Sequence, residues 1–381
     1  MALKQNTWTL NQWYDQDVAG NVSYSTNLNG LWGWGKDHYG QLGQNSITSP
    51  ARSSPVQIPG STWKTLGMDG NNQYQMTATK TDGTLWVWGQ NIHGALGLNE
   101  SGNSPGRSSP TQIPGTNWSD AMWSGTGGVL AVKTDGTLWG WGVSNDGFRG
   151  DNLGPGNNKS SPVQIGSDTT WGTTIGKVGR SAAIKTDGTL WAWGGQEVHN
   201  NKTKRSSPVQ VGSGTDWSTL KSVAYAGSAV KTDGTLWLWG TNSAGKLGQN
   251  NLTEYSSPIQ IPGTWKDLVG GGVHSVNGYI NTDNELWVMG DNEKGYLGQN
   301  NLTQYSSPVQ VPGSWDQVGM TAYATMGIKT DGTAWVWGQT NEYGELGLNA
   351  GVNYSSPVQL PGTDWDKPTG GMLQMFALKK Q

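Results

Sequence analysis

The chain is most informative at first for what it lacks. It has no cysteine in 381 residues, which excludes disulfide bonds and thiolate metal sites. Charged residues make up only 13% of it and the formal net charge is −3, so it offers no basic patch of the kind that nucleic-acid binding normally needs. No segment approaches the roughly 20 apolar residues of a membrane helix, and no apolar run near Met1 could serve as a secretion signal. We therefore expect neither a nucleic-acid partner nor membrane insertion.

Glycine and tryptophan are abundant instead, with 59 and 23 copies, and they follow a repeat. The stretch Lys-Thr-Asp-Gly-Thr-Leu-Trp-Val-Trp-Gly at 80–89 returns at 133–142, 185–194, 231–240 and 329–338, with degraded copies at 27–35 and 281–290. Asp-Gly is a strong turn signal, and the alternating Leu-Trp-x-Trp run that follows is typical of a strand. Each copy therefore predicts a β-hairpin.

Two more landmarks complete each unit. A Ser-Ser-Pro-x-Gln segment begins at Ser53, Ser108, Ser160, Ser206, Ser256, Ser306 and Ser355, and a lone tryptophan follows at Trp63, Trp118, Trp171, Trp217, Trp265, Trp315 and Trp365. A period near 50 residues with about four short strands indicates a propeller blade rather than a helical solenoid. Seven units lie within the usual range of a closed ring. We predict an all-β chain with a lead-in over residues 1–12 and a single seven-bladed β-propeller over residues 13–381.

The tryptophans are most simply explained by packing between blades, because thirteen of the 23 belong to the hairpins and seven are the lone landmarks. The lysine and aspartate of each turn are likewise expected to be structural. The segment before the Leu-Trp-x-Trp strand occurs at both termini, at 13–27 and at 365–379. We expect 374–378 to pair with the blade that contains 31–34, because an open ring would expose unpaired strand edges.

The loop after each hairpin carries a family resemblance. Trp-Gly-x-Asn followed by Gly-x-Leu-Gly at 88–97 closely resembles the repeat of the regulator-of-chromosome-condensation family, and Gly-x-Leu-Gly recurs at 40–43, 245–248, 295–298 and 344–347. The segment 272–275 also matches the Gly-x-His-Ser step of that repeat. The resemblance covers about residues 13–379 and implies a seven-bladed propeller. Unit three departs from it at 147–150, and unit four has lost the loop after Trp193.

Function follows less directly, because fold does not fix function. The family includes a nucleotide-exchange factor for a small GTPase and a β-lactamase inhibitor. The residue pattern of this repeat, Lys-Thr-Asp-Gly-Thr-Leu-Trp with Ser-Ser-Pro-Val-Gln, resembles propellers encoded by bacteria and their phages. It is less similar to the eukaryotic exchange factor, which has a basic tail. We therefore expect a non-enzymatic interaction scaffold, either a structural or receptor-recognition component of a virus particle or a cytoplasmic module that regulates a protein partner. A glycan-binding propeller is a third alternative.

Signals for chemistry are weak. The four histidines (His38, His93, His199 and His274) fall in four different units without metal-ligand spacing, and neither a nucleophile elbow nor a phosphate-binding loop is found. We expect no catalytic residue, no cofactor and no bound metal.

One position in the repeat does vary in a pattern. The residue before each Ser-Ser-Pro reads, in chain order, Arg52, Arg107, Lys159, Arg205, Tyr255, Tyr305 and Tyr354. In a ring, this order predicts a rim with a basic arc and an aromatic arc. These side chains either cover apolar surface at the blade edge or form a partner-binding rim, since arginine and tyrosine are enriched in interface hot spots.

Overall fold

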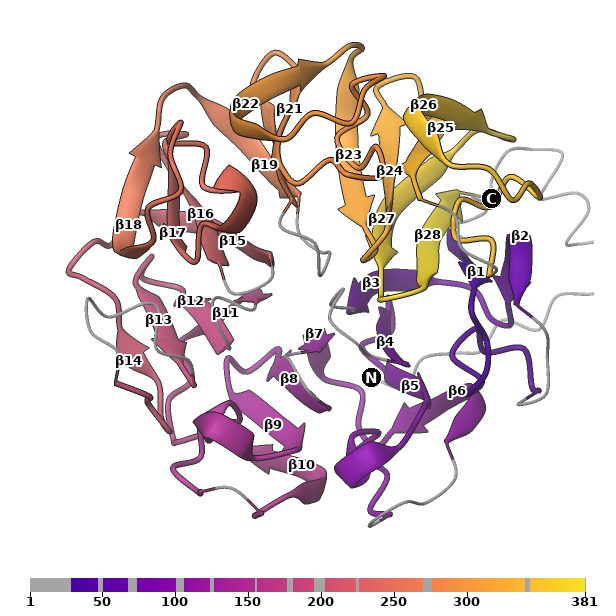
Figure 1. Ribbon diagram of the computed structural model, residues 1–381. Helices are drawn as coiled ribbons and strands as arrows, with labels where there is room; N and C mark the ends of the chain where they lie inside the picture. Colours follow the sequence, from indigo (N-terminus) through magenta and orange to yellow (C-terminus); the bar gives the residue numbers. More distant parts are fainter. Residues whose placement is uncertain are drawn as a thin grey trace, which may run out of the picture.

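The chain forms a closed ring of seven blades, each an antiparallel sheet of four strands (Figure 1). The computed structural model describes residues 29–46, 51–67, 74–100, 106–123, 127–154, 156–176, 181–194, 203–223, 226–269, 276–339 and 343–380. The predicted lead-in, the N-terminal segment copy at 13–27 and the Gly-x-His-Ser match at 272–275 lie outside the described residues. The all-β, seven-bladed prediction is confirmed.

Each blade takes the number of the repeat unit whose Leu-Trp-x-Trp strand it contains, and its strands are given from the centre of the ring outward. Blade 1 consists of β27 (Trp365–Gly370), β28 (Gln374–Lys380), β1 (Asn29–Gly35) and β2 (Arg52–Ile58), and blade 2 of β3 (Trp63–Gly67), β4 (Gln75–Lys80), β5 (Leu85–Gly89) and β6 (Arg107–Ile113). Blade 3 consists of β7 (Trp118–Trp123), β8 (Gly128–Lys133), β9 (Leu138–Gly142) and β10 (Lys159–Gln164), and blade 4 of β11 (Trp171–Gly176), β12 (Ser181–Lys185), β13 (Leu190–Trp193) and β14 (Val209–Gln210).

Blade 5 consists of β15 (Trp217–Val223), β16 (Ala226–Lys231), β17 (Leu236–Gly240) and β18 (Tyr255–Ile261), and blade 6 of β19 (Trp265–Val269), β20 (Val276–Asn281), β21 (Leu286–Gly290) and β22 (Tyr305–Val311). Blade 7 consists of β23 (Trp315–Met320), β24 (Ala324–Lys329), β25 (Ala334–Gly338) and β26 (Tyr354–Leu360). Helix within the described residues is limited to the 3-10 turns η1 (Ile92–Gly94), η2 (Asn145–Gly147) and η3 (Ser243–Gly245). None of these helices is long and apolar enough to cross a membrane.

The Asp-Gly hairpin turns follow from local hydrogen bonds that the repeat encodes. In blade 2, Asp82 Oδ1 accepts bonds from the backbone N–H of Thr84 at 3.0 Å and from its hydroxyl at 2.6 Å. Gly83 takes a φ of 79°, which glycine adopts without steric penalty. Trp86 Nε1 then donates to Thr84 Oγ1 at 2.8 Å, so the turn also orients the first hairpin tryptophan. The same relay recurs in blades 3, 4, 5 and 7.

The hydrophobic core is divided among the seven boundaries between blades, and each boundary has its own cluster. At the boundary between blades 2 and 3, Trp118 packs edge-on against Trp139 and Trp141, with ring centroids 6.1 Å apart in both pairs. The ammonium of Lys133 lies 3.9 Å from the Trp139 ring centroid and 4.8 Å from that of Trp118. The tryptophans and turn lysines therefore have the structural roles that the repeat predicts.

Ring closure occurs within blade 1, which takes its two inner strands from the C-terminus and its two outer strands from the N-terminal part of the chain. Strand β28 pairs with β1 along its whole length, with Leu31 opposite Leu378 and Trp32 opposite Ala377. This confirms the predicted pairing of 374–378 with 31–34.

Removing the C-terminal strand β28 should therefore open the ring. We predict that a chain truncated before Gly371 loses stability sharply or aggregates, because β1 would be left with an unpaired edge and β27 would lose the strand that joins it to β1. Thermal unfolding and size-exclusion chromatography of the truncated and full chains would measure this. A truncated chain that stays monomeric and melts like the full chain would contradict the role given to β28.

The lone tryptophans should each contribute strongly to stability. Trp315 is fully buried and packs against Trp337 with centroids 5.6 Å apart. We predict that Trp315→Ala lowers the free energy of unfolding by about 3–5 kcal/mol, as expected for a large buried aromatic side chain. Urea unfolding would measure the loss, with Lys329→Met as a control that removes the ammonium but keeps its aliphatic chain. A loss below about 1 kcal/mol in Trp315→Ala would contradict the packing role.

Candidate partner-binding face

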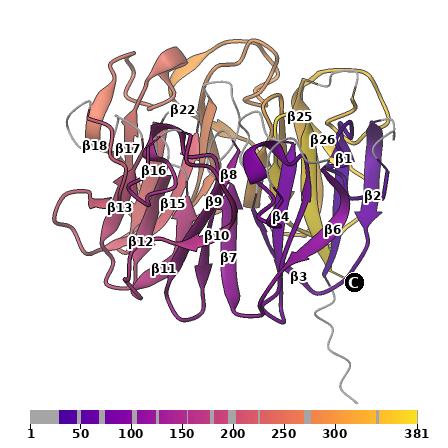
Figure 2. The same cartoon turned by 90° about the horizontal axis from the view of Figure 1, so that it is seen from below.

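The two faces of the ring carry different loops (Figure 2). The Asp-Gly turns lie on one face, here called the turn face. The long loops between the third and fourth strands of the blades lie on the opposite face. In blades 1, 2, 5, 6 and 7 these loops contain Gly-x-Leu-Gly, and the described loops of these blades and of blade 3 pack on the next blade.

The loop of blade 2 illustrates the arrangement. Leu96 is buried in the core cluster between blades 2 and 3. The carbonyl of Ala95 accepts a hydrogen bond from Trp141 Nε1 of blade 3 at 2.9 Å, and Asn99 N–H donates to the carbonyl of Ser160 at 2.7 Å. We call this set of contacts a clasp, and the face that carries the loops the clasp face.

Close approach explains the first glycine of each clasp. Gly94 has a φ of 74°, and a Cβ at this position would lie 2.6 Å from the Cβ of Ser160. A side chain would therefore be strained by the backbone conformation and would also collide with the next blade. The Ser-Ser-Pro landmark is the surface on which the preceding blade closes.

Clasps join six of the seven boundaries in the described part of the chain. The indole N–H of a hairpin tryptophan donates to a clasp carbonyl from Trp34, Trp88, Trp141, Trp193 and Trp337. Blade 6 has Met289 at this position, and there Asn277 Nδ2 donates to the clasp carbonyl of Lys246 at 2.8 Å instead. The asparagine-to-serine bond recurs from Asn45, Asn99, Asn152, Asn250, Asn300 and Asn349.

The two irregular units behave differently. In unit three, Arg149 replaces the buried leucine and pairs with Asp151, and the clasp is intact because Trp193 donates to Phe148 O. In unit four, residues 195–202 lie outside the described residues. No clasp bond to blade 5 is formed within the part that the structure describes.

The seven predicted rim residues occupy equivalent places, at the outer strand of each blade. Arg52, Arg107, Lys159, Tyr255, Tyr305 and Tyr354 each begin that strand opposite the last glycine of the third strand, and Arg205 O accepts a bond from the equivalent Gly194. All seven side chains are half-buried, one to a blade. They therefore surround the ring rather than converge on one pocket.

The tyrosines of the aromatic arc support the loops of their own blades. Tyr255 OH accepts a bond from Asn251 Nδ2 at 3.3 Å, and Tyr305 OH accepts one from Asn301 Nδ2 at 3.1 Å. The rings of Tyr255, Tyr305 and Tyr354 also pack against the boundary cores. These rings therefore cover apolar surface at the blade boundaries, and a contact of theirs with a partner stays a prediction.

Exposed apolar side chains lie directly beside these tyrosines. Leu252, Leu302 and Val352 are 68%, 60% and 54% exposed, and they precede the rim tyrosine by three residues in blades 5 and 6 and by two in blade 7. We call these three residues the apolar tips. The sequence does contain a signal for the apolar tips, because an aliphatic residue precedes the rim tyrosine by two or three positions in three successive units. This pattern does not indicate whether the side chains are buried or exposed.

Hydrogen bonds hold two of these tips in one conformation. Asn251 Oδ1 accepts from the N–H of Thr253 at 2.8 Å, and Asn301 Oδ1 accepts from Thr303 N–H at 2.9 Å. Asn242 Nδ2 and Asn292 Nδ2 then donate to the carbonyls of Asn251 and Asn301. The loops thus present Leu252 and Leu302 in the same way on adjacent blades.

A separate pocket of about 350 Å³ lies between blades 2 and 3, lined by Trp118, Trp139, Lys133, Gln112 and Pro162 among others. Trp139 is the tryptophan of this pocket that is partly exposed. The Lys133 ammonium covers one face of its ring and the edge of Trp118 packs against it. This geometry does not favour stacking of a sugar, so the pocket lends no support to the glycan alternative.

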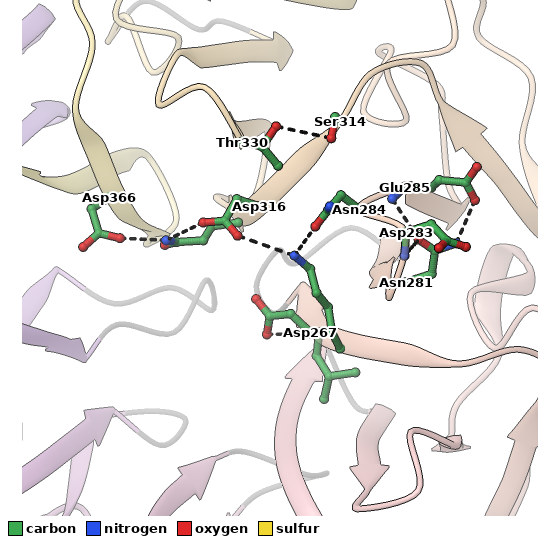
Figure 3. Close-up of polar contacts among 12 residues, drawn as sticks. Asp267, Asn281, Asp283, Asn284, Glu285, Ser314, Asp316, Thr330 and Asp366 are labelled. Atoms are coloured by element: carbon green, nitrogen blue, oxygen red, sulfur yellow. Dashed lines mark hydrogen bonds and ion pairs between the residues drawn. The ribbon is translucent and has the colours of Figure 1, made fainter.

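Polar contacts connect the innermost strands on the turn face (Figure 3). Gln317 Nε2 donates to Asp366 at 2.7 Å, and Lys266 pairs with Asp316 at 3.5 Å between blades 6 and 7. The carboxylates of Asp366 and Asp316 are therefore each paired with a side chain of the preceding blade. Across the described residues, no group of three or more His, Asp or Glu side chains could hold a metal ion.

Comparison with known proteins agrees with this geometry. Residues 82–128 and 233–276 match the family model described as the regulator of chromosome condensation (RCC1) repeat. The protein named "Regulator of chromosome condensation" from Xenopus laevis is 30% identical over 117 residues, which make up 30% of this chain and 27% of that relative. The chain thus matches little more than a quarter of the length of this curated relative.

Solved structures match over nearly the whole ring. Prp20p from Saccharomyces cerevisiae superposes with a TM-score of 0.78 at 16% identity, over 96% of this chain and 94% of that one. Human WBSCR16 gives a TM-score of 0.79 at 16% identity, over 92% and 100% of the two chains. The chain therefore shares the seven-bladed propeller fold of these structures and carries matches to the RCC1 repeat in part of its length. Because these relatives come from frog, yeast and human, they give no support to the expected bacterial or phage type.

The clasp of blade 1 contains a buried aspartate. Asp37 is fully buried, and burial raises its pKa to about 6, although a hydrogen bond from Leu42 N–H and the charge of Arg52 both oppose this rise. Asn91, Asn242 and Asn292 occupy the equivalent position in other clasps and accept the same leucine N–H without a charge.

Stability should therefore depend on pH through Asp37. Because its folded pKa lies above the ordinary value of 3.8, the folded state favours the protonated acid, and stability is lost as pH rises from about 4 to about 6. We predict that Asp37→Asn stabilises the protein by about 1–3 kcal/mol at pH 7.5 and changes little at pH 4. Urea unfolding at both pH values would measure this. Asn91→Asp should show the opposite trend, and equal effects of Asp37→Asn at both pH values would contradict the interpretation.

Proposed function

We propose that this chain is a non-enzymatic scaffold that binds a protein partner through the clasp face, with the apolar tips Leu252, Leu302 and Val352 at the centre of the contact. The observation that carries this proposal is their exposure in corresponding loops, two or three residues before the rim tyrosine, on three adjacent blades. Strands β18, β22 and β26, which follow these tips, lie in succession along the outer edge of the ring (Figure 1).

Physical chemistry favours a protein as the ligand of this surface. Water-exposed leucine and valine side chains contribute to binding by leaving water, and an apolar surface on a partner would cover them. Rigid loops lose little conformational entropy on binding, and the asparagine bonds fix two of the three loops in advance. Tyr255, Tyr305 and Tyr354 form the support beneath the tips and the rim of the contact. The predicted basic arc of Arg52, Arg107, Lys159 and Arg205 stays a second, polar part of the proposed rim.

The fold neighbours also point to protein partners. Prp20p is described with its binding properties to Gsp1p and histones, and yeast RCC1 (Prp20) has been solved bound to Kap60. These partners belong to those proteins. For this chain they favour a regulatory protein-binding module, the predicted alternative, while a role in a virus particle stays a prediction.

The apolar tips can be tested without disturbing the ring. We predict that a variant with Leu252→Ser, Leu302→Ser and Val352→Ser keeps its Tm within about 1 °C, because these side chains are exposed. Its binding of the partner should fall at least tenfold. Quantitative capture of cell proteins on immobilised wild-type and variant propeller would measure this.

Leu153→Ser in blade 3 provides the matched control, since Leu153 is also exposed, at 38%, but lies away from the three adjacent blades. It should retain every partner. If a partner captured specifically by the wild type is captured equally by the triple variant, the binding surface lies elsewhere on the ring.

A further inference from the structure

The pocket between blades 2 and 3 combines apolar surface with one lysine ammonium. Its volume of about 350 Å³ lies within the range of small-molecule sites. Leu98, Pro114, Pro162 and Trp139 supply apolar surface. Among the residues that line the pocket in the described part of the chain, Lys133 is the one that carries a charge. Apolar walls around a single charge are typical of a site for a small charged molecule.

The ammonium of Lys133 lies over two tryptophan rings without a carboxylate beside it. It is 3.9 Å from the ring centroid of Trp139 and 4.8 Å from that of Trp118. Within the residues that the structure describes, it forms no ion pair. The acid of the same turn, Asp135, accepts the hydroxyl and the N–H of Thr137 instead. The ammonium therefore keeps donors for an anion.

Blades 4 and 5 show how the chain neutralises this charge elsewhere. Lys185 pairs with Asp168, and Lys231 Nζ lies 3.2 Å from Asp216 Oδ2. In blade 3, Asn117 stands at the position of Asp216, directly before the lone tryptophan. An amide cannot neutralise an ammonium, so the pocket keeps its positive charge.

The apolar wall of the pocket comes from a second departure from the repeat. In blades 1, 5 and 6 a glutamine follows the last clasp glycine and donates to the outer strand of its own blade, for example from Gln44 to Gln57 O and from Gln299 to Gln310 O, both at 3.0 Å. In blade 2 this position is Leu98, which packs against the boundary core. A leucine side chain has no polar group, so the wall is apolar here.

The two departures coincide at one boundary of the ring. Leucine also follows the last clasp glycine in blade 7, as Leu348, but the residue before the lone tryptophan of the next blade is then Asp364. Thr62 precedes the lone tryptophan of blade 2, but the clasp that packs there has Gln44. An apolar clasp residue without an acid before the tryptophan is therefore particular to the boundary between blades 2 and 3.

The neighbouring strand edge disfavours an extended chain as the occupant. Pro110 lies in the middle of the outer strand β6 and removes a backbone donor from it. Addition of a partner strand depends on a continuous row of backbone donors and acceptors. The volume of the pocket also suits one compact molecule.

We propose that this pocket binds a small organic acid. Its carboxylate pairs with the ammonium of Lys133 in a charge-assisted hydrogen bond, and its apolar body lies against Leu98, Pro162 and Trp139. The apolar body contributes to binding because it leaves water. The pocket belongs to blades 2 and 3, whereas the apolar tips belong to blades 5, 6 and 7, so this site is separate from the proposed protein-binding surface.

A matched pair of probes tests the charge requirement. 1-Naphthylacetate has a carboxylate and an aromatic body, and 1-naphthylacetamide has nearly the same shape without the charge. Isothermal titration calorimetry on the full chain should show one saturable site for the acid and binding of the amide that is at least tenfold weaker. Equal affinity for the two probes would show apolar adsorption only and would overturn the proposal. Absence of acid binding at about 1 mM probe would do the same.

Three variants test the residues. Lys133→Met removes the charge and keeps the aliphatic stem, Asn117→Asp supplies an internal acid as in blade 5, and Leu98→Gln restores the glutamine of blade 1. Each should weaken binding of the acid about tenfold. The last two introduce residues that the fold contains at equivalent positions, so their Tm should stay within about 2 °C of the wild-type value.

Lys329→Met is the matched control, because it removes the equivalent ammonium from blade 7 and should bind 1-naphthylacetate like the wild type. Unchanged affinity in folded Asn117→Asp and Leu98→Gln would overturn the proposal, as would an equal loss in Lys329→Met. The triple variant of the apolar tips should also bind the acid like the wild type, so this inference and the proposed function can fail separately.

Discussion

The ring depends on one constraint: a blade is a thin sheet that needs apolar cover on both faces, and only its two neighbours can supply it. Tryptophan meets this need because it buries a large surface and its indole N–H still requires a partner. Trp141, for example, fills the boundary between blades 2 and 3 and is anchored to the Ala95 carbonyl of the preceding blade. Packing and hydrogen bonding thus act across the same boundary and fix how one blade is placed on the next.

This constraint explains why so much of the repeat is fixed. Gly94 must be glycine because Ser160 of the next blade lies against it, and Leu96 must be apolar because it enters the boundary core. Lys133 lies over two tryptophan rings on the turn face, where its charge stays near water while its stem covers the rings. Residues that look like functional groups in the sequence, such as the lysine and aspartate of each turn, are used to hold the ring.

Freedom to vary is left at two kinds of place. The outer loops have to return to the fourth strand, but the residues at their tips are not part of the clasp contacts. At these tips the chain exposes Leu252, Leu302 and Val352. The loop of unit four is also shorter in sequence than the others, while the described residues form apolar cores on both sides of blade 4. Binding surfaces on such a scaffold therefore arise where the repeat is relaxed. This is why departures from the repeat are more informative about function than the repeat itself.

The fold could be predicted from the residue pattern. Asp-Gly turns and Leu-Trp-x-Trp strands at a period near 50 specify blades, because turn chemistry and side-chain alternation are local properties. Pairing of the two termini also followed, since an unpaired edge is unfavourable in any ring. The site followed only in part. The rim position was found, but whether Tyr255 and Tyr305 face a partner or support a loop depends on Asn251 and Asn301, whose positions are set by the folded loop.

The remaining features depend on how the blades meet. The buried indole N–H of Trp239 has no partner among the described residues, although in the sequence this tryptophan is identical to its bonded equivalents. No residue pattern indicates that Asp37 is buried with a raised pKa, because this burial arises only when the blades pack together. Exposure, hydrogen-bond satisfaction and charge environment are properties of surfaces that meet only after folding, whereas turns and strands are encoded in neighbouring residues.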